Sequence, residues 1–236
     1  MKTTVYKANT RGHADHGWLN AWHSFSFAGY HDPERIHFGA LRVLNDDTVA
    51  GGMGFGMHPH ENMEIITIPL SGQLEHRDSM GNTGVISKGE VQVMSAGSGI
   101  QHSEKNKNHN EPVKLLQIWV FPDTKNVKPR YDQRAFDLGS SRNRLVNIVS
   151  PMGESEGLNI HQHAWFHLGR LDKDTALSYQ LKDEHNGVYA FVIDGDVTIN
   201  GEKLERRDAI SMAEAGKLDI KADSDAEVLL MEVPMY

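Results

Sequence analysis

The chain of 236 residues contains no cysteine. Disulfide bonds and thiolate metal ligands are therefore excluded, so any metal ion must be held by histidine and carboxylate side chains. The absence of cysteine also fits a reducing compartment, and we expect a cytoplasmic protein.

Long apolar runs are absent as well. No stretch approaches the roughly 20 apolar residues that a membrane-spanning helix needs. The N-terminal segment MKTTVYKANTRGHADHGW has neither the apolar core nor the small-residue cleavage site of a signal peptide. We therefore expect no signal peptide and no membrane partner.

Positive charge is scarce. The chain has 24 lysine and arginine residues against 32 aspartate and glutamate residues, for a formal net charge of -8. Binding to nucleic-acid phosphates needs a positively charged footprint. The densest basic stretch, residues 125–134, is short and is interrupted by a proline and an aspartate. We therefore expect no direct nucleic-acid partner, and the acidic charge favours a protein partner over DNA.

Histidine, in contrast, is abundant, with 14 copies. His58 and His60 lie two residues apart in the segment GMGFGMHPHENMEIITIPLSG, residues 52–72, which has the pattern of a strand. Residues two apart on a strand share a face, so both imidazoles can reach one metal ion while Pro59 points the other way. An isolated pair of this kind is weak evidence in a histidine-rich chain. His161 and His163 form a second pair without a partner motif, and we expect them to be surface or hydrogen-bonded residues.

A second segment, residues 89–106 (GEVQVMSAGSGIQHSEKN), carries His102 and Glu104 at the same spacing. Together the two segments offer three neutral nitrogens and one carboxylate. This mixed donor set suits a divalent transition metal and leaves coordination positions open for a substrate. Iron(II), nickel, manganese, cobalt, copper and zinc are all compatible with it.

Short strands separated by glycine turns recur along the whole chain and predict an all-β fold. Residues 189–210 repeat the pattern of residues 65–94, with Asn200-Gly201 as a hairpin turn. We therefore predict two β-sandwich or jelly-roll barrels. Residues 1–135 would form a metal-binding domain ending in a linker arm at 123–135, and residues 136–236 a second domain without metal ligands. The only helix candidate is residues 209–215.

The first segment follows the first cupin motif, which here comprises Gly52, His58, His60, Glu64 and Gly72. The second cupin motif is matched by Gly89, Gly97, His102 and Asn106. Two departures are present. The turn before His102 is two residues longer than usual, and the spacing of Glu64 and Gly72 fits two different forms of the first motif. Glu64 is therefore out of step as a ligand, and we expect it to be structural or to orient a ligand imidazole.

These departures resemble one cupin subfamily, the pirins. The similar runs are HGWLNAWHSFSFAGYHDP, HFGALRVLNDD, HPHENMEIITIPLSG, HRDSMGN and MSAGSGIQHSE. The resemblance is strong over the first 135 residues and weak thereafter. It implies a bicupin whose N-terminal domain binds one metal ion, iron by first expectation. The ligands that it implies are His58, His60, His102 and Glu104.

The resemblance also implies a function. Bacterial pirins are associated with quercetin 2,3-dioxygenase activity, so we expect a polyphenol substrate, dioxygen and ring opening. Glu104 would act as general base toward the 3-hydroxyl of a flavonol. The expected substrate slot is apolar and consists of Phe38, Phe55, Met94 and Trp119.

Two other hypotheses stay open. The human pirin is described as an iron-binding nuclear transcription co-regulator, which suggests a metal- or redox-sensing protein that binds a protein partner without turnover. The third hypothesis is a cupin isomerase or storage-type protein with a vestigial site.

Overall fold

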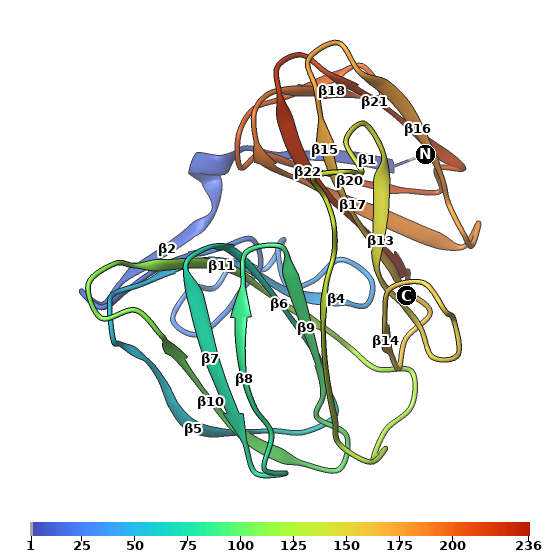
Figure 1. The fold of residues 1–236 in the computed structure, drawn as a ribbon. Coiled ribbons are helices and arrows are strands. Elements are labelled where there is room, and N and C mark those ends of the chain that lie inside the picture. Colours follow the sequence, from blue (N-terminus) through green and yellow to red (C-terminus); the bar gives the residue numbers. More distant parts are fainter. Residues whose placement is uncertain (1) are drawn as a thin grey trace.

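The structure, a computed structural model, describes residues 2–236. These residues form twenty-two β-strands and one short 3-10 helix, η1 (Ala8–Thr10), which confirms the all-β prediction. None of the helices within residues 2–236 is long and apolar enough to cross a membrane. Figure 1 shows two barrels, the N-terminal one coloured blue to green and the C-terminal one mostly yellow to red.

The N-terminal barrel consists of a seven-stranded and a four-stranded sheet. The large sheet has the order β12 (Arg130–Ala135), β9 (Glu90–Ser95), β6 (Glu64–Ser71), β11 (Val113–Val120), β4 (Leu41–Val49), β3 (Leu19–His23) and β2 (Gly12–Asp15). The small sheet has the order β5 (Gly54–His60), β10 (Ile100–Asn106), β7 (Gln73–Asp78) and β8 (Thr83–Ser87).

The C-terminal barrel repeats this design. Its large sheet has the order β1 (Lys2–Tyr6), β20 (Ala209–Ala213), β17 (Asn186–Asp194), β22 (Ala226–Pro234), β15 (Trp165–Leu171), β13 (Leu145–Pro151) and β14 (Leu158–Ile160). Its small sheet has the order β16 (Ala176–Gln180), β21 (Lys217–Ala222), β18 (Val197–Ile199) and β19 (Glu202–Leu204). Neighbouring strands are antiparallel in both barrels, except that β13 and β14 are parallel.

Residues 1–135 were expected to form the N-terminal domain, and the structure differs from this expectation at both ends of the range. β1 pairs with β20 along its whole length, so the start of the chain belongs to the C-terminal sheet. The expected arm at 123–135 is partly a strand, because β12 pairs with β9 at the edge of the N-terminal sheet. The helix expected at 209–215 is wrong. β20 lies there instead, since strands on both sides satisfy its backbone hydrogen bonds.

The largest apolar cluster lies between the two large sheets and joins the domains. It includes Leu44, Ile66 and Ile118 from the N-terminal sheet and Phe166 and Leu229 from the C-terminal sheet, each at most 1% exposed. Burying one such side chain contributes about 1.5–3 kcal/mol relative to leaving it in water. A shared core of this kind holds the two barrels as one unit.

The interiors of the two barrels differ in polarity. The C-terminal barrel is filled mainly by an apolar cluster that includes Val188, Ala190, Ile210, Ile220 and Leu230, with a few buried polar side chains such as His167 and Glu232. The N-terminal barrel, in contrast, buries polar side chains, namely His76, His102, Glu104, Asn45, Asp47, Thr67 and Gln117. Buried polar groups need partners, and the N-terminal barrel is therefore where a functional site is expected.

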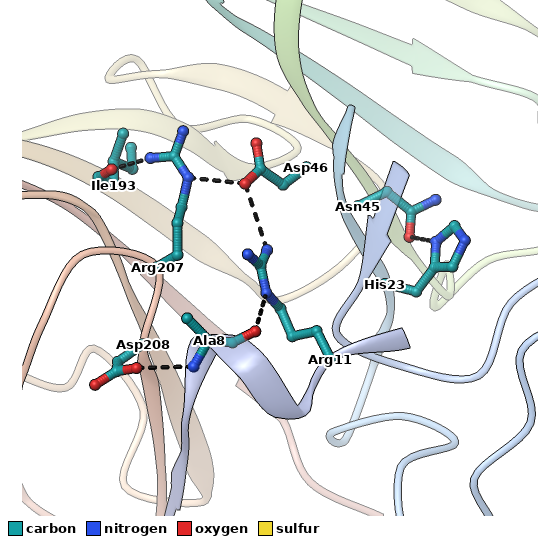
Figure 2. A network of polar contacts seen from close by, with 8 residues as sticks. All are labelled: Ala8, Arg11, His23, Asn45, Asp46, Ile193, Arg207 and Asp208. Atoms are coloured by element: carbon teal, nitrogen blue, oxygen red, sulfur yellow. Dashed lines mark hydrogen bonds and ion pairs between the residues drawn. The ribbon is translucent and has the colours of Figure 1, made fainter. Parts of the chain in front are cut away.

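A polar network joins the N-terminal segment to both domains (Figure 2). Asp46, on β4, accepts hydrogen bonds from Arg207 Nε at 2.7 Å and Arg11 NH1 at 3.4 Å. Arg207 also donates to the carbonyl of Ile193, and Arg11 Nε donates to the carbonyl of Ala8. The two arginine side chains are 8% and 10% exposed, so a single carboxylate pairs with two nearly buried cations.

Candidate metal centre

Three histidines converge at one end of the N-terminal barrel. His58 and His60 lie on β5, and His102 lies directly opposite His58 on β10. The centroids of the three rings are 4.4 to 4.9 Å apart. One nitrogen of each ring lies within 4.8 Å of the other two, which is close enough for all three to bind one ion.

The backbone around these histidines has two special features. The register between β5 and β10 shifts between His102 and Glu104, as at a β-bulge, which re-aims side chains next to the irregularity. Gly54 lies against the backbone of Glu104 and Lys105, and a Cβ atom at that position would overlap the carbonyl of Glu104. Glycine at this position therefore permits the close approach of the two strands.

Two of the three imidazoles are in the state that a metal ion requires. Burial lowers the pKa of His102 to about 2, and burial together with His58 lowers the pKa of His60 to about 4. Both rings are thus neutral at pH 7 and offer lone pairs. His58 Nδ1 lies 2.8 Å from the carbonyl of Gly56, which leaves its Nε2 as the nitrogen that an ion would bind.

His102 supplies the clearest sign of a ligand. It is 2% exposed, and neither of its ring nitrogens has a hydrogen-bond partner. A buried imidazole without partners is costly unless something binds it. The chemistry of these donors fits a divalent metal ion.

Glu104 is 3% exposed and lies beside a second group of candidate ligands. Its carboxylate accepts a hydrogen bond from Gln117 Nε2 at 2.5 Å and one from Thr67 Oγ1 at 3.4 Å. Its ligand oxygen clusters with nitrogens of His102 and His76 within 4.8 Å. The four expected ligands therefore do not form one group here. His102 belongs to both groups, and Glu104 is held by Gln117.

His76 was missed in the sequence. It is fully buried on β7, opposite Glu104, and its Nε2 lies 3.2 Å from the carboxylate of Asp78. Its Nδ1 has no partner. A carboxylate behind a histidine is the arrangement that commonly supports a metal-ligating imidazole. The sequence contains a signal for it, because His76 and Asp78 lie two residues apart in a segment with the pattern of a strand and therefore share a face.

A cavity of about 250 Å³ opens above these groups. Its lining combines the metal-binding face with an apolar and a polar wall. The lining residues are Leu19, Ala21, His23, Phe27, Asn45, Asp47, Phe55, His58, His60, Ile65, His102, Glu104, Gln117 and Trp119.

Two of the four expected substrate-slot residues, Phe55 and Trp119, line this cavity. The expectation for Phe38 and Met94 is wrong. Phe38 packs near Tyr189 in the core shared by the two domains, with ring centroids 5.9 Å apart. Met94 is fully buried in a cluster with Ile65, behind the cavity wall. Closeness in sequence to a ligand strand does not determine which face a side chain occupies.

Glu64 faces away from the metal centre. On β6 it shares a face with Ile66, whereas Ile65 points into the cavity. Its carboxylate accepts a hydrogen bond from Ser95 Oγ at 2.7 Å and lies 3.5 Å from Nδ1 of His161. Glu64 thus contacts the other domain and orients none of the three clustered imidazoles. His161 is hydrogen-bonded as expected, because its Nδ1 lies 3.3 Å from Ser95 Oγ.

Glu64 makes the stability of the protein depend on pH. Burial raises its pKa from 4.5 to about 7, so between these values the folded carboxyl keeps a proton that the unfolded one has lost. Its contribution to stability is complete below pH 4.5 and is lost as pH rises to 7. Between these values Glu64 should lower the free energy of unfolding of the wild type by at most about 1.4 kcal/mol per pH unit, and Glu64→Gln should remove this decline. Urea unfolding at several pH values measures this, with the exposed Glu184→Gln as control. Parallel profiles for Glu64→Gln and wild type would contradict the assignment.

The fold and the histidine cluster define a class of protein, a bicupin with a divalent metal centre in its N-terminal barrel. The pirin family model matches residues 4–120, and a quercetinase C-terminal cupin domain matches residues 147–233. The chain belongs to the pirin family.

Several relatives resemble the chain over nearly its whole length. It is 46% identical over 228 residues to a quercetin 2,3-dioxygenase of Escherichia coli K12, with 97% of each chain covered. It is 39% identical over 222 residues to a pirin-like protein of Caulobacter vibrioides, with 94% of this chain and 95% of that one covered. The crystal structure of the bacterial pirin YhhW from Escherichia coli in complex with nickel(II) has a TM-score of 0.94 and 43% identity, with both chains fully covered.

Proposed function

We propose that the protein is a metal-dependent dioxygenase that opens the ring of quercetin-like flavonols. His58, His60, His102 and Glu104 would hold the ion, and Fe(II) is our first choice, although the donor set also suits nickel. The observation that carries the proposal is the convergence of three histidines, two of them with strongly lowered pKa, at a cavity lined by aromatic side chains. The names of the relatives support the choice of substrate.

A bound divalent ion would supply a positive charge that acidifies a hydroxyl group next to it. The protein supplies the rest. Phe55 and Trp119 enclose the flat rings and exclude water. Glu104 accepts the proton of the 3-hydroxyl as general base. Gln117 and Thr67 hold the carboxylate in position through their hydrogen bonds.

Oxygen uptake tests the proposal. The protein is loaded separately with each first-row divalent metal and mixed with quercetin, while dissolved oxygen, flavonol absorbance and carbon monoxide are recorded. We expect oxygen to fall and the flavonol spectrum to bleach with at least one metal. No change with any metal would overturn the proposal. If a partner protein were then captured only in one oxidation state of the metal, the regulatory alternative would be favoured.

Glu104→Gln is expected to retain the metal but lose turnover by about 100-fold or more, because the amide cannot accept the proton. Metal content by elemental analysis and turnover by oxygen uptake are measured on the same sample. Glu111→Gln, at an exposed loop position, is the matched control and should behave as wild type. Normal turnover in Glu104→Gln would show that another group is the base.

A further inference from the structure

One buried carboxyl in the cavity has no role in the proposed chemistry. Asp47 lies on β4, is 3% exposed, and lines the cavity together with Asn45. Its Oδ1 has no hydrogen-bond partner. The neighbouring residue Asp46 points to the opposite side of the strand, toward Arg11 and Arg207, as Figure 2 shows. Because neighbouring side chains on a strand point to opposite faces, Asp47 does not take part in the network of Arg11 and Arg207.

The charges around Asp47 do not compensate it. Burial, together with the nearby acidic groups of Asp46 and Glu104, raises its pKa to about 8. No lysine or arginine lines the cavity among the described residues. An unpartnered buried polar group costs about 1–3 kcal/mol. Such a cost within a ligand cavity indicates a group whose partner arrives with the ligand.

A second polar pair lies on the same wall. His23 Nδ1 lies 2.9 Å from Asn45 Oδ1, which leaves the amide nitrogen of Asn45 and the other ring nitrogen of His23 free for further contacts. The same cavity is also lined by the aromatic side chains of Phe27, Phe55 and Trp119. A flat, weakly acidic molecule with several hydroxyl groups matches this combination of polar and aromatic lining.

We propose that Asp47 recognises the substrate by accepting a hydrogen bond from a phenolic hydroxyl other than the one at the metal centre. This inference rests on the proposed function, because it assumes that the cavity holds a polyphenol. The acceptor is the carboxyl of Asp47, whose Oδ1 has no partner in the free protein. This carboxyl keeps acceptor capacity in its protonated form and is a stronger acceptor when ionised, so recognition requires no proton transfer. Asp47 is then a specificity-determining residue, and Glu104 keeps the catalytic role.

The test compares quercetin with 3-hydroxyflavone, which keeps the 3-hydroxyl and lacks the others. Dissociation constants are measured without oxygen, by quenching of tryptophan fluorescence in the metal-loaded protein. We expect wild type to prefer quercetin and Asp47→Ala to reduce this preference about tenfold. Asp47→Asn, which retains an oxygen acceptor, should keep part of it. Asp194→Asn, in a surface ion pair with Arg206, is the control and should leave the preference unchanged.

The melting temperature separates recognition from a structural role. Removing an unpaired buried carboxyl should not lower it, so we expect Asp47→Ala to melt at or above the wild-type temperature. Equal loss of affinity for both flavonols together with a lower melting temperature would overturn the proposal. So would a wild-type protein with no preference for quercetin, a result that needs no variant. Because binding is measured without turnover, absence of oxygen uptake would overturn the proposed activity and leave this inference standing.

Discussion

His102→Ala is expected to abolish metal binding and turnover together. The ring of His102 belongs to both groups of candidate ligands, and it is the most deeply buried of the three clustered imidazoles. Losing a residue that merely supports a ligand costs 10–100-fold in metal affinity or activity, so losing this ligand should cost at least about 100-fold. Metal per chain and oxygen uptake are the two measurements.

The melting temperature provides an independent test of whether His102 is a metal ligand. Metal at 100 times its dissociation constant stabilises the folded state by about 2.7 kcal/mol, so added metal should raise the melting temperature of wild type but not of His102→Ala. His163→Ala is the matched control, because His163 belongs to the other His-x-His pair and its side chain is 70% exposed. A metal-induced rise of equal size in His102→Ala and wild type would exclude His102 as a ligand.

Asp46→Ala is expected to destabilise the protein by about 3 kcal/mol or more. The substitution removes the one carboxylate between Arg11 and Arg207 and leaves two nearly buried cations facing each other. Burial lowers the pKa of Arg11, and the like charge of the nearby Arg207 also acts to lower it. In a chain of this size each kcal/mol shifts the melting temperature by about 2–4 °C, so a fall of at least about 6 °C is expected.

The matched control for Asp46 is Asp194, which pairs with Arg206 on the surface. Its ion pair is 3.0 Å long, but both side chains are more than half exposed, so Asp194→Ala should cost at most about 1 kcal/mol. A similar small loss in Asp46→Ala would show that the network does not hold the domains together. Arg207→Leu in the Asp46→Ala background should recover part of the stability, because it removes one of the unpaired cations.

Most of the architecture follows from local patterns. Alternation of polar and apolar residues with glycine turns predicts strands, and two such series predict two barrels, as the structure confirms. The convergence of His58, His60 and His102 was also predictable, because residues two apart on a strand share a face. Glu104 was predicted with them, yet in the structure it lies with His76 and is bound by Gln117.

What the sequence determined by itself is therefore the all-β class, the family and the residue types at the metal centre. Only the tertiary structure decided which strands meet and which face of each strand is inside. It assigned β1 to the distant C-terminal sheet, turned Glu64 toward His161, and placed Phe38 and Met94 outside the cavity. It also brought His76 and Asp47 inward. The physical reason is that alternating side chains divide a strand into two faces without specifying which face points into the barrel. Pairing between strands that are remote in sequence decides which face is inside.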